Sequence, residues 1–420
     1  MENNTLFLQL LIILLVARTL AEVAVWFQLP SIIGELFAGI LLGPSLLGWI
    51  SIDETLKLLA EFGVILLLFE VGLGTDIKRL ARSGKKSLIV AFGGFIFPFV
   101  FGFSISSFVF GLPLLVSMFI GGTLTATSIG ITVRILVDLN RLEATENQVV
   151  LGAAVIDDVL GVVLLTLLYQ FAVGGEISLL NTGKILLFVG VFFIVAPVIA
   201  KLISLVIKHY DEISKIPGLI PVTVVSLVLF FAWLAHFFGL PKLLGGFAAG
   251  MALSWRFILP FTEFHQSDIV FTSHIEDQMK PIIQLFTPFF FVLVGMSLNF
   301  HEIEWTSIFI WAFSLSLFAL AIIGKIIGAL LIDEKWLSRW AIGIAMIPRG
   351  EVGLVFAEMG RESHVFSNEI YAGMVFIIAL TTLSPPFILK WFYSRYHSDL
   401  PFDNNEMERR VIRDRRRVKR

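Results

Sequence analysis

The chain has 420 residues, of which 57% are hydrophobic and only 15% are charged, with a net charge of −2 and no cysteine. Because a soluble globular domain averages about a quarter charged residues, this composition excludes one. It also excludes a disordered chain, a nucleic-acid-binding surface, a disulfide scaffold, thiol catalysis and a cysteine-based metal site. The 41 Phe and 34 Gly indicate long apolar helices in close contact, which is typical of an all-α polytopic membrane protein.

Apolar windows of roughly 20 residues, the length that crosses a bilayer core, recur from one end of the chain to the other. They predict about thirteen transmembrane helices. The first window does not resemble a signal peptide, because Met1–Asn4 carries no positive charge and no small-residue cleavage site follows. In chain order the windows are 5–27, 31–50, 55–75, 87–111, 114–137, 147–172, 183–207, 219–239, 241–259, 282–300, 305–332, 337–360 and 368–393.

Lys and Arg gather in alternate loops, and this bias predicts the orientation. Loops on the other side offer little beyond Lys242 and Arg361. We therefore expect a protein of the cell membrane with its N-terminus outside and its C-terminus in the cytoplasm, where the basic tail contacts anionic lipid. The loops that then fall inside carry Lys78, Arg79, Arg82, Lys85, Lys86, Arg141, Lys201, Lys208, Lys215, Arg256, Lys280, Lys335, Arg339 and the tail from Arg409 to Arg420.

The sequence contains an internal repeat. The run Leu29–Gly34 matches Leu240–Gly245, and Val71-Gly72 matches Val294-Gly295 more weakly. Both matches relate spans that are seven apart, so the two copies enter the bilayer from opposite sides. This indicates an inverted-topology repeat of two six-helix units, the build of many secondary transporters. The alternative is a chance similarity of Gly-rich helices, which does not explain why both pairs keep the same offset.

Ionisable residues within predicted spans cost about 2.5–3.5 kcal/mol each on insertion scales, and three of them are the most informative. Asp157 and Asp158 are adjacent and flanked by apolar residues, and Lys325 lies in Gly324–Gly328. Neighbouring helical positions point about 100° apart, so the two carboxylates have different surroundings. One can coordinate a cation while the other, Asp157, pairs with Lys325. The alternatives are a carboxylate hydrogen-bonded between helices and a lysine that snorkels to the inner face.

Two spans are interrupted where a helix should continue. One interruption is Gly121–Ser128 in the fifth span, and the other is Ile347–Gly353 in the twelfth. They are again seven spans apart, which predicts two crossed discontinuous helices whose free carbonyls and helix ends lie beside the site. These backbone dipoles need counter-charges, and Arg349, Glu351 and, nearer the inner end, Arg134 are available. A simple kink is the alternative for either segment alone.

Other charged residues within spans are less informative. Arg18 and Glu22 stand one helical turn apart and should pair. Glu35, Glu61 and Glu70 line an aqueous cavity or lie near its mouth in our interpretation.

These motifs resemble the monovalent cation:proton antiporter family two over about residues 5–395. The resemblance implies a homodimer with a dimerisation domain (1–80 and 216–304), a linker span (176–215), a mobile core (81–175 and 305–397) and a basic tail (398–420). The runs that carry it are Leu29–Pro44, Thr123–Ser128, Val155–Gly161, Phe290–Gly295, Gly324–Gly328 and Pro348–Gly353.

The resemblance also implies roles for individual residues. Asp158 would be the main ligand of the transported ion, and Asp157 would form a proton-sensitive pair with Lys325. Thr125, Thr127 and Ser128 would line the site, while Arg349 and Glu351 would stabilise the helix crossing. No cofactor, resident metal or catalytic residue is expected.

We therefore expect a transporter, not an enzyme, that exchanges Na⁺ for H⁺ by electrogenic alternating access. The presence of both aspartates, and the lack of a large nucleotide-binding domain, favour Na⁺ over glutathione-gated K⁺ exchange, with Li⁺ and K⁺ left open. A K⁺/H⁺ antiporter is the nearest alternative. A passive cation channel gives no reason for an inverted repeat, and an intramembrane aspartyl protease needs its two acids on different spans.

Overall fold

The computed structural model of the chain describes residues 2–74, 77–142, 144–174, 219–238, 240–254 and 266–396, together with the single positions 183 and 199. All regular structure in these ranges is helical. Eight of the described helical segments are long and apolar enough to cross a membrane. The count of about thirteen spans stays a prediction, because almost all of the seventh predicted span (183–207) lies outside the described residues.

The described helices fall into an N-terminal and a C-terminal half, which correspond to the two predicted repeats. The N-terminal half contains α1 (Glu2–Trp26), α2 (Ser31–Leu42), α3 (Glu54–Gly74), α4 (Ile77–Ser104), the π-helical turn η1 (Ile105–Val109), α5 (Leu114–Thr125), α6 (Ile129–Asp138) and α7 (Thr145–Gly174). The C-terminal half contains α9 (Leu219–Phe237), α10 (Lys242–Leu253), α11 (Gln266–Ser297), the short η2 (Phe300–Glu302), α12 (Ile308–Leu330), α13 (Trp336–Ala345), α14 (Glu351–Glu362) and α15 (Asn368–Arg395).

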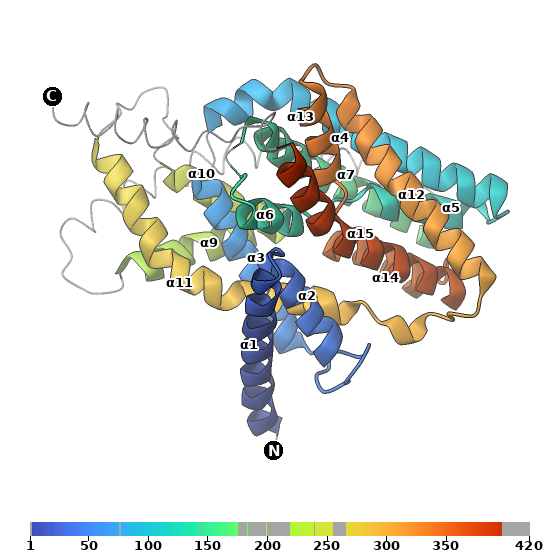
Figure 1. The fold of residues 1–420 in the computed structure, drawn as a ribbon, viewed down its shortest axis with the longest axis horizontal. Helices are drawn as coiled ribbons and strands as arrows, with labels where there is room; N and C mark the ends of the chain where they lie inside the picture. The colour runs from blue at the N-terminus through green and yellow to red at the C-terminus, as the bar shows by residue number, and fades with distance from the viewer. Residues whose placement is uncertain are drawn as a thin grey trace.

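Two groups of helices lie on either side of α6 (Figure 1). Helices α2, α3, α10 and α11 pack against one another, with α1 against α2 and α9 against α10. On the other side α4 packs along α12 and α7, while α13, α14 and α15 complete the group. The division into a dimerisation domain and a mobile core stays a prediction.

Close glycine contacts repeat between equivalent helices. A Cβ atom on Gly39 of α2 would lie 2.1 Å from the carbonyl oxygen of Val292 in α11, so the two backbones touch directly. A Cβ atom on Gly250 of α10 would lie 2.1 Å from the carbonyl oxygen of Phe69 in α3. The α2–α11 contact is therefore made a second time as α10–α3. This confirms the inverted repeat that the Leu-Pro runs predict.

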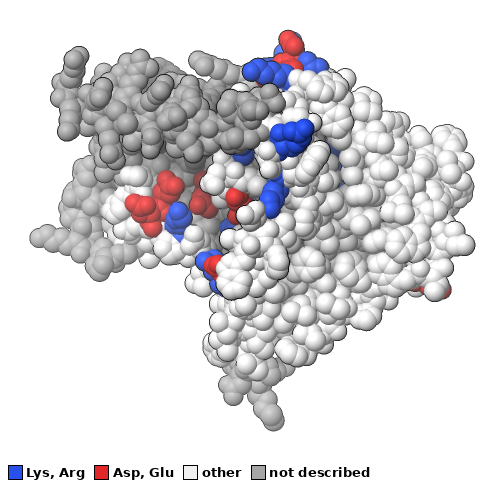
Figure 2. Space-filling model, in the orientation of Figure 1, with Lys and Arg blue, Asp and Glu red and all other residues white. Residues whose placement is uncertain are grey.

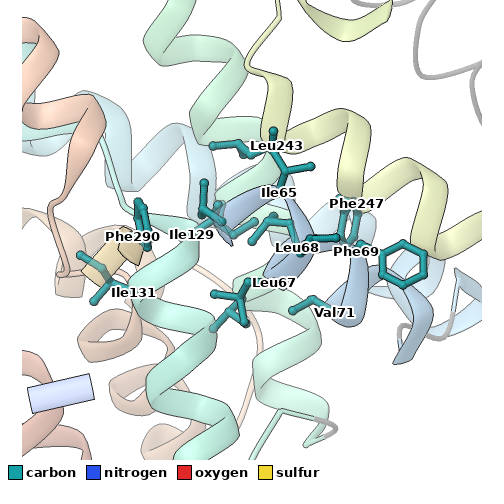
Figure 3. Packing of buried hydrophobic residues seen from close by; sticks show 14 of the residues in the cluster. Ile65, Leu67, Leu68, Phe69, Val71, Ile129, Ile131, Leu243, Phe247 and Phe290 are labelled. Carbon is teal, nitrogen blue, oxygen red and sulfur yellow. The ribbon is translucent and has the colours of Figure 1, made fainter. Parts of the chain in front are cut away.

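The centre of the molecule is an apolar junction between the start of α6 and helices α3 and α11 (Figure 3). Ile129 and Ile131 are buried there with Leu67, Leu68 and Phe290. On the face shown in Figure 2, the right half carries almost no charged side chain, while Lys, Arg, Asp and Glu gather near the centre and at the upper edge. Such an uncharged surface suits the acyl chains of a bilayer.

Candidate functional site

The two interrupted spans meet at their breaks. Residues 126–128 separate α5 from α6, and residues 346–350 separate α13 from α14. The backbone N–H of Ser128 donates to the carbonyl of Pro348 at 2.8 Å. The hydroxyl of Thr127 donates to the carbonyl of Met346 at 3.1 Å. Each break therefore satisfies backbone groups of the other, as buried non-helical backbone must be satisfied in a membrane.

Arg349 ties the second break to the end of α5. Its side chain is almost completely buried. One guanidinium nitrogen donates to the carbonyl of Ala126 at 2.6 Å, and the other donates to the carbonyl of Leu124. These carbonyls belong to the C-terminal end of α5, where a helix has unsatisfied acceptors and a partial negative charge. The structure thus places the Arg349 guanidinium at the crossing, against the end of α5.

Two hydroxyl groups that sequence reasoning missed also hold the crossing together. Thr132 of α6 donates to the carbonyl of Ala345 at 3.0 Å, and Thr382 of α15 donates to the carbonyl of Arg349. Both threonines are buried. Thr132 lies four residues after Ser128, so its position in the sequence could have suggested a role at the crossing. Nothing in the sequence around Thr382 indicates that its hydroxyl contacts Arg349.

Asp157 and Lys325 form an ion pair with 3.2 Å between Oδ2 and Nζ, and both side chains are fully buried. Asp157 comes from α7 and Lys325 from α12. Gly94 of α4 makes room for the lysine, because a Cβ atom there would lie 3.2 Å from its Cδ. The other carboxylate oxygen of Asp157 has no hydrogen-bond partner among the described residues. It is therefore available to another ligand.

Asp158 is also buried, on the helix that packs against α5, α6, α13 and α14, that is, against all four half-helices. Lys325 lies within electrostatic range of Asp158 as well as of Asp157 and Arg349. Two carboxylates and two cationic side chains thus gather beside the crossing. The predicted site requires that the side chain of Asp158 is buried within the protein and does not face the acyl chains, and this side chain is buried.

The hydroxyl residues of the first break are all buried. The hydroxyl of Thr125 donates to the carbonyl of Gly122 within α5, at 2.7 Å. A donating hydroxyl keeps lone pairs with which it can bind a cation. The described residues contain no group of three or more His, Cys, Asp or Glu side chains that could hold a metal ion. A hard monovalent cation at this place would therefore use carboxylate, hydroxyl and carbonyl oxygens together.

Glu351 and Arg134 are the other two residues that are predicted to stabilise the crossing. Glu351 is the first residue of α14, and its side chain lies outside the described part of the structure. Arg134 does not reach the crossing. It lies in the second turn of α6, and its guanidinium contacts Glu35 of α2 and Asp138 of α6, each at 3.4 Å. Its role as a counter-charge for the half-helices stays a prediction, and α6 turns this position toward α2.

Four further charged residues of the predicted spans, Arg18, Glu22, Glu61 and Glu70, lie near charged partners. Arg18 and Glu22 of α1 form the predicted one-turn pair at 3.4 Å. Glu61 of α3 pairs instead with Lys242 of α10 at 2.8 Å, and both side chains remain partly exposed. Glu70 lies within electrostatic range of Arg134.

An inverted repeat whose interrupted helices cross beside buried charges defines a class of protein, the membrane transporters with a site at the repeat interface. The chain belongs to the sodium/hydrogen exchanger family, since residues 10–395 match the family described as "Sodium/hydrogen exchanger, transmembrane". The predicted resemblance to cation:proton antiporters is thereby confirmed.

Individual relatives cover nearly the whole chain. The chain is 34% identical over 390 residues to the probable Na(+)/H(+) antiporter GerT of Bacillus cereus, covering 92% of this chain and 99% of GerT. It is 34% identical over 398 residues to the Na(+)/H(+)-K(+) antiporter GerN of the same organism, covering 92% and 96%. The fold is similar to that of the sodium proton antiporter MjNhaP1 from Methanocaldococcus jannaschii, with a TM-score of 0.67, 19% identity, and coverage of 94% of this chain and 98% of that one.

Proposed function

We propose that this protein is a secondary active transporter that exchanges Na⁺ for H⁺ across the cell membrane. The observation that carries the proposal is the adjacent pair of buried carboxylates, Asp157 and Asp158, beside two crossed helix breaks, with Asp157 paired to Lys325 at 3.2 Å. The names of the antiporters GerT and GerN, similar over most of the chain, support the same ion chemistry.

The exchange follows from competition for one set of oxygens. Na⁺ prefers hard oxygen ligands, which an ionised carboxylate supplies and a protonated one does not. Protonation of Asp158 therefore releases the cation, and binding of the cation releases the proton. Thr125, Thr127 and Ser128 add hydroxyl and backbone oxygens, and Arg349 and Glu351 hold the half-helices that frame the site.

Coupling requires that the loaded site faces one side of the membrane at a time. We assign this movement to a core of residues 81–175 and 305–397 that shifts against residues 1–80 and 216–304. The second group forms the contact of a homodimer in this proposal. The N-terminus lies outside the cell and the C-terminus in the cytoplasm, in agreement with the distribution of Lys and Arg.

We expect the exchange to be electrogenic, with two protons moved for each cation. Asp157 and Asp158 each carry a proton in one half of the cycle, so two protons move against one cation and net charge crosses the membrane. Proteoliposomes at a fixed Na⁺ gradient should then show proton flux that responds to a K⁺/valinomycin potential. Flux that is indifferent to the potential would contradict electrogenic exchange and leave exchange itself in place.

The test of the function uses purified protein in liposomes with a pH-sensitive dye inside. Addition of Na⁺ should drive proton movement in the unmodified protein, and Asp158→Asn should abolish it without loss of a monodisperse, thermally stable protein. Glu61→Gln is the matched control, because this carboxylate lies in a partly exposed ion pair with Lys242. Na⁺-driven proton flux that persists in Asp158→Asn would overturn the assignment of the ion ligand.

K⁺/H⁺ exchange is the second candidate, because GerN is described as an Na(+)/H(+)-K(+) antiporter. The same assay distinguishes the two when Na⁺, Li⁺ and K⁺ are added in turn at equal concentration. We expect Na⁺ and Li⁺ to drive proton flux. A response to K⁺ alone would favour the second candidate.

A further inference from the structure

A buried cluster of charged and polar side chains joins α6 to the beginning of α2, away from the two aspartates. We call Ser31, Glu35, Arg134 and Asp138 the α2–α6 bridge. Arg134 donates to the hydroxyl of Ser31 at 2.8 Å, and this hydroxyl donates to a carboxylate oxygen of Asp138 at 2.8 Å. Arg134 also contacts the carboxylate of Glu35 at 3.4 Å. The four side chains therefore form one connected network between two helices.

The bridge also completes α2. This helix follows Pro30, which offers no capping side chain. Asp138, 106 residues further along the chain, accepts a hydrogen bond from the backbone N–H of Ile32 at 3.3 Å. A carboxylate at a helix N-terminus satisfies free N–H groups and opposes the helix dipole. The end of α6 thus caps α2, and a separation of the two helices would remove this cap.

Little solvent reaches the bridge to compensate for a broken contact. The exposed fractions of the side chains are 4% for Glu35, 18% for Arg134 and 14% for Asp138. The second carboxylate oxygen of Glu35 has no hydrogen-bond partner among the described residues. The next charges around the cluster are Arg18 of α1 and Glu70 of α3. Opening of the bridge therefore leaves charges that are now paired either exposed to solvent or buried without a partner.

The inverted repeat does not reproduce the bridge on the other side of the membrane. The Leu-Pro runs align Ser31 with Lys242 and Glu35 with Gly246. The starts of α6 and α14 align Arg134 with Phe356 and Asp138 with Gly360. The equivalent positions hold one cation and no acid, so they cannot form the same network. The fold is symmetric, but this charged contact is on one side only.

We propose that Arg134 is a positioning residue for transport, and that the α2–α6 bridge is a latch that closes one side of the ion pathway and opens in every cycle. This inference rests on the proposed alternating access, in which α6 moves with the core while α2 stays in the dimerisation domain. With the orientation proposed above, the latch lies on the cytoplasmic side, where α2 begins and α6 ends. A latch on one side makes the two faces of the transporter unequal in energy.

A reversible crosslink tests whether the latch opens. The chain has no native cysteine, so Ser31→Cys with Asp138→Cys gives a clean thiol pair at a 2.8 Å contact. A short bis-methanethiosulfonate reagent should crosslink the two cysteines and abolish Na⁺-driven proton flux in liposomes. Dithiothreitol cleaves the crosslink and should restore the flux to the level of the variant that was never crosslinked. Recovery after reduction shows that the protein stayed folded.

The matched control joins two helices of the same group. Glu61→Cys with Lys242→Cys links α3 to α10 across a 2.8 Å ion pair. The crosslinked control should keep its flux within about twofold of the reduced form, because α3 and α10 do not move relative to each other in the proposed cycle. Flux that continues in the crosslinked Ser31/Asp138 variant would overturn the latch and leave Na⁺/H⁺ exchange intact. Absence of Na⁺-driven flux in the unmodified protein would instead refute the proposed function, and with it the latch.

Substitution of Arg134 separates positioning from ion binding. Arg134→Gln should change the maximal flux by about fivefold or more and shift the Na⁺ concentration at half-maximal flux in opposite directions for Na⁺ supplied on the two faces, because the apparent affinity on each face depends on the fraction of protein open to it. Arg134→Lys keeps the charge but cannot contact all three partners, so it should recover only part of the rate. A wild-type maximal flux in Arg134→Gln would contradict the latch, as would a change confined to the half-maximal Na⁺ concentration.

Discussion

The charges of Asp157 and Lys325 depend on each other, because both side chains are fully removed from solvent. Breaking a buried ion pair by removal of one partner costs about 3–5 kcal/mol, since the remaining charge is stranded. A surface pair such as Glu61–Lys242, which is partly exposed, contributes only about 0–1 kcal/mol. Loss of Lys325 and loss of Lys242 therefore compare a buried ion pair with a partly exposed one in the same protein.

We expect Lys325→Ala to lower the thermal stability of the purified protein and to change the pH profile of exchange. Ionisation of Asp157 then creates an uncompensated buried charge, so flux should require a more alkaline pH than in the unmodified protein. Dye-based flux measured across pH, with thermal unfolding of the same samples, checks both parts. Lys242→Ala should leave both nearly unchanged, and an unaltered pH profile in Lys325→Ala would mean that the pair has no role in proton exchange.

Thr382 is a second residue whose contribution can be isolated, because its hydroxyl donates to the carbonyl of Arg349. Thr382→Val keeps the shape and leaves a buried carbonyl without this donor, which costs about 1–3 kcal/mol. We expect a lower unfolding temperature and a slower flux in Thr382→Val, and recovery of both in Thr382→Ser. Equal behaviour of the valine and serine variants would show that the hydroxyl does not hold the crossing.

At the scale of helices, the crossing depends on one guanidinium that reaches two carbonyls at the end of α5. A lysine carries the same charge but has no planar fork, so it cannot satisfy both acceptors in the same way. We expect Arg349→Lys to lose most of the exchange activity and part of the thermal stability, although charge is conserved. Full activity of Arg349→Lys would indicate that only the charge near the helix end matters.

The repeated glycine contact between helices offers a test of the internal symmetry. A Cβ atom on Gly39 or on Gly250 would lie 2.1 Å from a backbone oxygen of the neighbouring helix. Gly39→Ala and Gly250→Ala should therefore destabilise the protein by similar amounts, about 1–3 kcal/mol each, as overpacking does. Gly84→Ala is the control, because nothing lies within 4 Å of the added atom. A stable Gly250→Ala beside an unstable Gly39→Ala would contradict equivalent packing in the two repeats.

At the scale of the whole molecule, the sequence predicts the inverted repeat, both helix breaks and the Asp157–Lys325 pair. These features are predictable because a charge or an interruption within an apolar span is costly and has few possible partners. The contacts of Arg134 and Thr382 were not predictable in the same way. Arg134 meets Glu35 across 99 residues and Thr382 meets Arg349 across 33, and which helix faces a given side chain depends on packing that local sequence does not encode.

In the proposed mechanism, one Na⁺ and protons compete for the carboxylates at the helix crossing. Calorimetric titration of Na⁺ into the purified protein, at a series of pH values and in buffers of different ionisation enthalpy, tests it directly. If binding displaces two protons, as the electrogenic cycle requires, the apparent Kd should weaken by about a hundredfold for each unit of pH below the titration range of both carboxylates, and by about tenfold where only one is protonated, and protons should be released on binding. Asp158→Asn should remove both the binding and the proton release. A Kd that does not depend on pH, or Na⁺ binding without proton release, would contradict the account.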